Sequence, residues 1–193
     1  MSFDNPTVFD DLLEGFLCYR ILRPRYEEYV KKLELKGSEK VLDFGCGTGA
    51  SSKPILKKLS DGGHLTCLDI SHFWLKKAKK RFSKFNNVDF KIGDITIVDI
   101  PGKSYDLISI YYVLHDIDRY QRQKIINLLS SKLKDYGRLA IKEPIKKSHG
   151  MPVKEIRDLM NNSGLKEICF KMNKSHYFGI FKIGKENNKS LDR

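Results

Sequence analysis

Apolar and polar positions along the chain follow two rhythms that predict strands and helices in turn. Continuous or alternating apolar runs, as at 64–70, 88–92 and 105–114, are typical of strands. Between these runs, apolar residues recur every three or four positions at 71–82 and 118–134, which is the spacing of an amphipathic helix. Repeated strand–helix units predict an α/β fold built on a mostly parallel sheet.

The first of these helices has a recognisable start and two distinct faces. Ser71 suits the N-cap, because its hydroxyl can accept a hydrogen bond from a backbone amide of the first turn. We expect the buried face to consist of Phe73, Trp74, Ala78 and Phe82. The lysines between them would face solvent.

The end of the chain departs from this alternation. Residues 152–164 predict a helix, with Pro152 suited to its first turn and Gly164 to its end. The strand-like runs 165–172 and 176–183 are separated by only three residues, too few for a helical crossover, so these strands must pair antiparallel. We therefore expect a seven-stranded, mostly parallel sheet with one antiparallel strand in a C-terminal hairpin. The expected strands cover residues 41–44, 64–70, 88–92, 105–114, 138–143, 165–172 and 176–183.

The first 36 residues lie outside the strand–helix pattern and predict a short helical cap. Asn5 and Pro6 suit the start of one helix, and Pro24 suits the start of a second. Because both helices precede the first strand, they can lie across the sheet edge or over its ligand crevice. No linker or internal repeat separates them from the rest. We expect one domain over 1–193, comprising a cap at 1–36, a core at 37–184 and a disordered tail at 185–193.

Composition agrees with a globular, cytoplasmic protein. Of the 193 residues, 40% are hydrophobic and 31% are charged. No apolar run approaches the roughly 18 residues of a membrane span, and the acidic start lacks the pattern of a signal peptide. The four cysteines are far apart and show no metal-ligand spacing, so we expect reduced thiols and no metal site. They are Cys18, Cys46, Cys67 and Cys169.

The chain has 36 Lys and Arg residues and only 24 Asp and Glu residues, which gives a net charge of +12. A charge of this size raises the question of a polyanionic partner. The basic residues gather in separate clusters, at 74–85, at 143–150 and near the C-terminus, rather than along one stripe. No RNA-binding signature with interleaved aromatic residues occurs. A solvated lysine-rich surface is the favoured interpretation, and a nucleic-acid partner is the less favoured alternative.

Three glycines follow the first predicted strand: Gly45, Gly47 and Gly49. A backbone without side chains lets a ligand approach closely, and the carboxyl end of the first strand is where α/β sheets bind ligands. Gly45, Gly47 and Ala50 also fit the dinucleotide fingerprint, and Asp69 follows Gly47 at the distance of a ribose-binding acid. The loop alone is therefore compatible with a nicotinamide cofactor. It is not a phosphate-binding P-loop, because no GK[ST] sequence follows the glycines.

Two further acids favour a different nucleotide. Asp43, two residues before Gly45, can hold a cationic amine but would repel a pyrophosphate. Asp94 follows the third strand, within reach of an adenine amino group. The six-stranded parallel dinucleotide-binding fold also lacks the antiparallel hairpin expected at the end of this chain.

Five segments between Lys40 and Ile183 resemble, in order, the motifs of class I S-adenosylmethionine-dependent methyltransferases. They are VLDFGCGTG, LTCLDIS, VDFKIGDI, YDLISIYYVLHDI and LKDYGRLAIKE. The resemblance is greatest to the broad group of ubiquinone and menaquinone C-methyltransferases and small-molecule methyltransferases. It implies a Rossmann-like fold with helices on both faces of the sheet. It also implies in-line methyl transfer from S-adenosylmethionine to a small-molecule acceptor, leaving S-adenosylhomocysteine.

The resemblance assigns roles to particular residues. Asp43 and the glycine loop would face the methionine part, with Asp43 directing its α-amino group either directly or through water. Asp69 would accept from both ribose hydroxyls, and Asp94 from the adenine amino group. Ile70 and Ile95 would cover the adenine faces. The implied cofactor-binding set is Asp43, Gly45, Cys46, Gly47, Gly49, Asp69, Ile70, Asp94, Ile95 and Tyr111.

Catalytic candidates end the fourth strand or follow it. Tyr111 and Tyr112 are adjacent, so only one is expected to face the pocket of an extended strand. A general base is needed only for a protonated acceptor, and His115 is the best candidate, with a helix-capping role as its alternative. Tyr111 and His115 are thus the catalytic candidates. Candidate substrate contacts are Phe16, Tyr19, Tyr112, Glu143 and His149.

Three functions stay open at this point. The first is a small-molecule methyltransferase, the second an RNA methyltransferase that uses the basic surface, and the third a non-catalytic cofactor-binding subunit. No NPPY or DPPY motif follows the fourth strand, which argues against amino-methylation of DNA bases or of protein glutamine. The sequence sets neither the accepting atom nor the oligomeric state.

Overall fold

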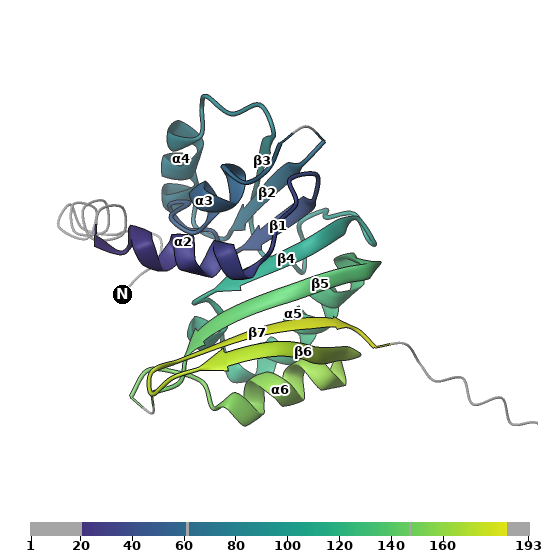
Figure 1. Ribbon diagram of the computed structural model, residues 1–193. Helices are drawn as coiled ribbons and strands as arrows, with labels where there is room; N and C mark the ends of the chain where they lie inside the picture. The colour runs from purple at the N-terminus through teal and green to yellow at the C-terminus, as the bar shows by residue number, and fades with distance from the viewer. Residues whose placement is uncertain (1–20, 61, 147, 185–193) are drawn as a thin grey trace, which may run out of the picture.

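The computed structural model describes residues 21–60, 62–146 and 148–184. Their strands form one seven-stranded sheet in the order β3-β2-β1-β4-β5-β7-β6 (Figure 1). β7 pairs antiparallel with both of its neighbours, and the other strand pairs are parallel. This confirms the expected topology. The strands are β1 (Lys40–Phe44), β2 (His64–Asp69), β3 (Val88–Ile92), β4 (Tyr105–Tyr111), β5 (Leu133–Pro144), β6 (Leu165–Met172) and β7 (His176–Ile183).

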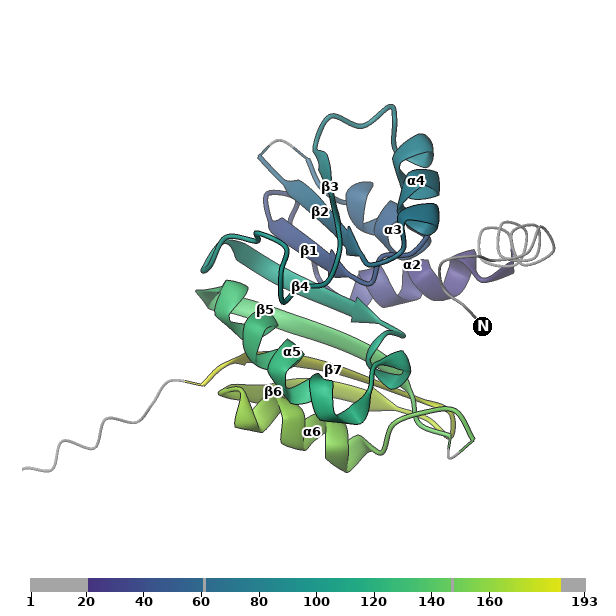
Figure 2. The same cartoon turned by 180° about the vertical axis from the view of Figure 1, so that it is seen from behind.

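Helices cover both faces of the sheet, as expected. One face carries α2, α3 and α4, and the opposite face carries α5 and α6 (Figures 1 and 2). The 3-10 turn η2 joins β4 to α5. The bounds are α2 (Arg23–Lys32), α3 (Ser52–Leu56), α4 (His72–Arg81), η2 (Leu114–Asp116), α5 (Arg119–Lys132) and α6 (Val153–Asn162). No helix among the described residues is long and apolar enough to cross a membrane.

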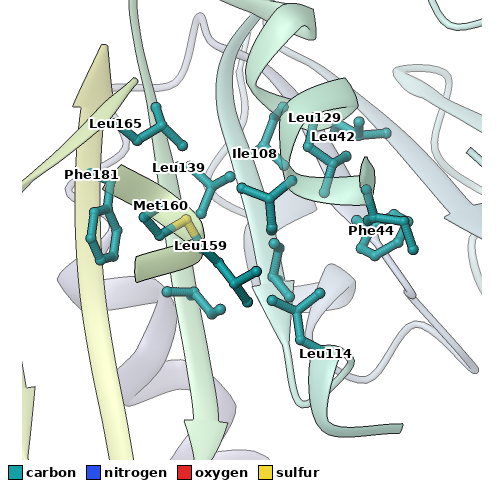
Figure 3. Packing of buried hydrophobic residues seen from close by; sticks show 14 of the residues in the cluster. Leu42, Phe44, Ile108, Leu114, Leu129, Leu139, Leu159, Met160, Leu165 and Phe181 are labelled. Carbon is teal, nitrogen blue, oxygen red and sulfur yellow. The ribbon is translucent and has the colours of Figure 1, made fainter. Parts of the chain in front are cut away.

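The two apolar layers explain why β4 reads as a continuous apolar run. Leu107 packs into the layer beneath α2, α3 and α4, whereas its neighbour Ile108 packs into the layer against α5 and α6 (Figure 3). Both residues are fully buried. A strand covered on both faces has no polar side, and this is typical of the centre of a parallel sheet.

Two details differ from the expectation. In α4, Ser71 accepts a hydrogen bond from the Trp74 amide as expected. Leu75 is buried with Ala78 and Phe82, whereas Phe73 and Trp74, expected on the buried face, are only partly buried. The second difference is that β5 begins at Leu133 rather than after Gly137. The chain passes directly from α5 into β5, whose register with β4 shifts near its start. A shifted start of this kind leaves no signature in the apolar pattern.

The second cap helix is confirmed. In α2, Tyr26, Tyr29 and Val30 are buried on one face, and Leu33 after the helix is fully buried. The ring of Tyr29 packs edge-on against Phe178 of β7, with the ring centroids 5.8 Å apart. The segment expected to form the first cap helix, with Phe16 and Tyr19, lies outside the described residues, as do Cys18 and residues 185–193.

Candidate functional site

A cleft of about 450 Å³ lies at the carboxyl ends of β1, β2, β3 and β4. This volume is within the usual range of small-molecule sites. The cleft lies where β1 separates β2 from β4, the point at which the strand order reverses. Residues that line it include Gly47, Asp69, Asp94, Tyr111 and Asp116.

The three glycines of the first loop have left-handed backbones but serve different purposes. A Cβ on Gly47, with φ +52°, would meet no atom within 4 Å, so its bare face opens on the cleft. A Cβ on Gly49 would lie 2.5 Å from the Phe82 ring. Gly49 therefore allows α4 to pack closely, and it does not line the cleft, contrary to the cofactor contact implied for it. Gly45 and Cys46 do line the cleft.

A Cβ on Gly45 would lie 2.5 Å from Val113, so this glycine also lets two segments approach each other. Its amide donates to the Leu68 carbonyl at 2.8 Å. Cys46 has a buried thiol whose pKa is raised by its hydrogen bond with Cys67 and by burial. The loop is thus tied to the end of β2, and the Cys46 thiol is engaged with Cys67 in the core.

Asp69 joins the glycine loop to the start of α4. Its Oδ2 accepts a hydrogen bond from the Gly47 amide at 2.7 Å, and its Oδ1 accepts one from the Ser71 amide at 2.8 Å. Each oxygen of an ionised carboxylate can accept more than one hydrogen bond. The two backbone amides therefore hold the carboxylate at the cleft wall, in a fixed orientation.

Asp43 lies beneath the loop rather than in the cleft. It is 1% exposed, and its Oδ2 accepts hydrogen bonds from Ser52 at 2.6 Å and from Ser51 at 3.2 Å. Burial raises its pKa to about 6, although these hydroxyl groups oppose the shift. Of these three residues, Ser51 lines the cleft. Ser51 was not among the residues predicted from the sequence, although two serines follow the loop closely.

The far end of the cleft combines a carboxylate with apolar side chains. Asp94 and Ile95 follow β3, and Ile70 follows β2, and all three line the cleft. The Oδ1 atom of Asp94 accepts from the Thr96 amide at 2.7 Å, which orients the carboxylate. Trp74 lines the same region but had been expected to pack only in the core.

Tyr111 and Tyr112 both line the cleft, so the expectation that only one would do so is wrong. Tyr112 follows the last residue of β4 and has φ +59°, which ends the alternation of an extended strand. Its ring lies 4.5 Å from that of Tyr111 and stacks on His176 at 5.5 Å. Tyr111 also packs against Tyr29 of α2, with the ring centroids 4.8 Å apart.

Lys142 was missed by the sequence analysis. It lies opposite Tyr111 on β5, and its Nζ donates a hydrogen bond to the Tyr111 hydroxyl at 3.2 Å. Partial burial lowers the pKa of Lys142 to about 8. The available sequence signal was a lysine directly after the apolar run 139–141 of the same strand.

Glu143 and His115 form a buried pair behind the cleft. Glu143 is fully buried, and its Oε1 accepts from the amides of Val113 at 3.0 Å and Leu114 at 2.8 Å. Its Oε2 lies 2.7 Å from Nδ1 of His115, whose side chain is 8% exposed. Neither residue lines the cleft. Their placement fits a role in holding the turn after β4 better than direct contact with a substrate.

Asp116 and His149 complete this region. Asp116 lines the cleft, and its Oδ2 lies 3.4 Å from Nε2 of His115. His149, in the segment between β5 and α6, places its Nε2 3.9 Å from Oδ1 of Asp116. The His149 side chain is 77% exposed. The structure therefore brings His149 and His115 together, as their ring centroids are 5.1 Å apart, but outside the cleft lining.

Comparisons with known proteins agree on one family. A family model described as a methyltransferase domain matches residues 35–190. A demethylmenaquinone methyltransferase of Tropheryma whipplei is 33% identical over 93 residues, which cover 47% of this chain and 36% of that protein. A malonyl-[acyl-carrier protein] O-methyltransferase of Ilyobacter polytropus is 36% identical over 139 residues, covering 69% of this chain and 50% of that protein. The chain thus spans half or less of the length of these two curated relatives.

Solved structures share the fold at low identity. A SAM-dependent methyltransferase from Aquifex aeolicus has a TM-score of 0.71 and 18% identity, covering 88% of this chain and 93% of that one. A TehB-like SAM-dependent methyltransferase from Corynebacterium glutamicum has a TM-score of 0.74 and 18% identity, covering 93% and 100%. These similarities show that the chain shares the fold of these two proteins.

Proposed function

The chain belongs to the class I S-adenosylmethionine-dependent methyltransferases, and on this premise we propose that it methylates a small-molecule acceptor held near Tyr111, Tyr112 and Asp116. The observation that carries the proposal is the arrangement of the cleft. One cleft is lined at one end by the carboxylates of Asp69 and Asp94 and at the other by two tyrosine rings. The first end suits an adenosine and the second an acceptor beside a cationic methyl donor.

The residues present fit S-adenosylmethionine. Gly47 offers a bare backbone with no atom near its Cβ direction, Asp69 offers an oriented carboxylate for the ribose diol, and Ile70 and Ile95 offer apolar surface for a flat base. Asp94 would accept from the adenine amino group. When bound, the cofactor supplies an electrophilic methyl group on a sulfonium.

Asp43 would act through the loop rather than by lining the cleft. Above a pH of about 6 it carries a negative charge directly beneath Ser51 and Ser52. A buried anion attracts the cationic amine of a methionine group, because charges in a partly desolvated site are weakly screened. Ser51 lines the cleft and donates a hydrogen bond to Asp43, so it is the residue best placed to connect the buried charge with the amine of the cofactor.

The tyrosine end would orient the two reactants. Tyr26, Tyr111 and Tyr112 line this end of the cleft, and aromatic rings favour a nearby cation. Methyl transfer depends chiefly on holding the acceptor in line with the donor. The hydrogen bond from Lys142 and the contact with Tyr29 hold the Tyr111 ring in one orientation.

His115 is better understood as a positioning residue than as a base that touches the acceptor. Glu143 holds its Nδ1, and its Nε2 points toward Asp116, which does line the cleft. The direct candidates for contact with the acceptor are therefore Asp116, Tyr111 and Tyr112.

Two observations favour a small acceptor over RNA. The exposed lysines Lys76, Lys79 and Lys80 lie on α4, which packs against β2 and β3, whereas the tyrosine end of the cleft lies at the carboxyl end of β4. The names of the two relatives quoted above also refer to demethylmenaquinone and to a malonyl group on a carrier protein.

Calorimetry with S-adenosylhomocysteine and with a nicotinamide dinucleotide tests the cofactor assignment. We expect binding of the first and none of comparable affinity for the second. Methyl transfer from radiolabelled S-adenosylmethionine to a panel of small phenols, quinols, thiols and carboxylic acids tests the acceptor. Transfer to RNA alone would overturn the small-molecule assignment.

A further inference from the structure

Of the chain's five histidines, His115 and His176 pack against Tyr112, and His149 packs against His115. Both His115 and His149 lie near the Asp116 carboxylate. Ligand atoms of His115, Asp116 and His149 all lie within 4.8 Å of one another. We propose that these three residues bind a divalent transition-metal ion, for which Zn²⁺ is the best match. No metal site was expected from the sequence, because the four cysteines show no metal-ligand spacing. His149 is separated from the other two ligands by more than 30 residues.

The distances suit such an ion. Zinc is held by histidine nitrogens and carboxylate oxygens at about 2.0–2.2 Å, usually in tetrahedral geometry. Two ligand atoms in that geometry are about 3.4 Å apart, and Nε2 of His115 lies 3.4 Å from Oδ2 of Asp116. Nε2 of His149 lies 3.9 Å from Oδ1 of Asp116 on a largely exposed side chain, so a small rotation completes the site.

A separate observation points to a ligand at Nε2 of His115. The fully buried Glu143 accepts from Nδ1 of this imidazole at 2.7 Å, and two backbone amides hold the same carboxylate in place. With Nδ1 as the donor, Nε2 carries the lone pair and faces Asp116. Metal-binding histidines are commonly oriented by a carboxylate in this way, which fixes the tautomer and increases basicity.

The donor set also limits the kind of ion. Two imidazoles and one carboxylate suit zinc and its neighbours among the transition metals, whereas calcium and magnesium prefer oxygen ligands alone. Three protein ligands leave at least one coordination position for another molecule. Arg122, the cation beside the site, donates to the His115 carbonyl at 3.1 Å and to Glu155 at 2.9 Å, so it is engaged away from Nε2.

The location suggests what the open position would bind. Asp116 belongs both to this site and to the cleft lining, close to Tyr112. An ion held there would coordinate an oxygen or sulfur atom of the acceptor as its anion, with the displaced proton released to solvent. Coordination of the acceptor by the ion rests on the proposed function, whereas binding of the ion itself does not.

The site is tested by measuring the zinc affinity of the untagged full-length protein. The protein competes for zinc with a chromophoric chelator under reducing conditions. We expect one ion per chain, with affinity at least tenfold lower in His149→Ala and Asp116→Asn. His72→Ala is the matched control, because His72 is an exposed histidine on α4 far from the cluster. Failure of the wild type to bind, or unchanged affinity in His149→Ala and Asp116→Asn, would overturn the proposal.

Two further measurements separate this inference from the proposed function. The absorption spectrum of the Co²⁺ complex should show no thiolate-to-metal charge-transfer band, because the proposed ligands include no cysteine. Such a band would show that the ion is bound by cysteines and would overturn the assignment. Affinity for S-adenosylhomocysteine should be the same in His149→Ala as in the wild type. If zinc binding fails while this affinity is present, only the metal site is wrong. If zinc binds as expected and the cofactor does not, only the proposed function is wrong.

Discussion

Lys142 and Tyr111 face each other across β5 and β4, and the lysine amine both donates to the tyrosine hydroxyl at 3.2 Å and lies 4.8 Å from the ring centroid. The pair places a cation beside an aromatic residue that lines the cleft. A sulfonium in front of that ring would be attracted by the ring but repelled by the lysine. The lowered pKa of Lys142, about 8, makes this repulsion dependent on pH.

The first prediction follows from this pair. Lys142 is charged below its pKa of about 8 and neutral above it, so affinity for cationic S-adenosylmethionine should rise as the pH passes through 8. A repulsion on the order of 1 kcal/mol corresponds to about fivefold. Neutral S-adenosylhomocysteine is the control ligand, and calorimetry from pH 7 to 9 gives the ratio of the two affinities. In Lys142→Met this ratio should not change with pH, and a constant ratio in the wild type would contradict the prediction.

Asp69→Ala should weaken S-adenosylhomocysteine binding by at least tenfold, because two charged hydrogen bonds to the ribose, each worth about 1.5–3 kcal/mol, would be lost. Some loss of thermal stability should accompany it, since Asp69 also holds the amides of Gly47 and Ser71. Asp89→Ala is the matched control, because Asp89 is an exposed carboxylate on the neighbouring strand. Equal affinity in the two variants would show that Asp69 does not bind the ribose.

Asp43→Asn should stabilise the protein at neutral pH while weakening binding of the cofactor. Burial raises the pKa of Asp43 to about 6, above its value near 3.9 in an unfolded chain. The stability linked to this group is therefore fully present below about pH 4 and is lost as the pH rises through 6. An amide at this position carries no charge, so the variant should gain about 1–3 kcal/mol at pH 7.5 and little at pH 4.

Thermal or urea denaturation of both proteins at these two pH values measures the difference. A variant less stable than the wild type at pH 7.5 would show that the hydrogen bonds from Ser51 and Ser52 outweigh the desolvation of the charge. Calorimetry on the same samples tests the loss of cofactor affinity.

Gly47→Ala and Gly49→Ala should have different effects although the two glycines are neighbours in one motif. At Gly49 an alanine meets the Phe82 ring and a left-handed backbone, so stability should fall by about 2–4 kcal/mol. At Gly47 the Cβ has space, so stability should fall by only about 1–2 kcal/mol. Its methyl group would occupy the cleft, so cofactor affinity should fall more than in Gly49→Ala. Denaturation and calorimetry on both variants give the comparison, and the reverse order would contradict it.

Reversing the charges of Lys76, Lys77, Lys79 and Lys80 should leave turnover of a small acceptor unchanged. These residues lie on α4, away from the tyrosine end of the cleft. Binding of the wild type to RNA should be weak, and its dependence on salt should become shallower in the variant, by about 0.7 per lost contact with a single strand. Filter binding at several salt concentrations measures this slope. Selective loss of activity on RNA, with cofactor affinity unchanged, would favour an RNA methyltransferase.

Local pattern determined most of the architecture. Apolar periodicity depends on which face of an element is buried, so the alternation of strands and helices could be read along the chain. The three-residue spacer after β6 allowed only an antiparallel partner. Asp69 and Asp94 end or follow strands, and parallel strands bring their carboxyl ends to one edge, so the cleft could be located from the sequence.

Tertiary structure alone decided which side chains reach the cleft. Tyr112 joins Tyr111 there because a positive φ angle ends the strand alternation, and Gly49 does not because Phe82 from a distant helix packs on it. The proposed metal ligands His115 and His149 are far apart in sequence and meet only because β4 and β5 are neighbours in the sheet. Periodicity records whether a residue is buried, but the direction of a side chain at a strand end depends on backbone angles and on neighbours that folding brings from elsewhere in the chain.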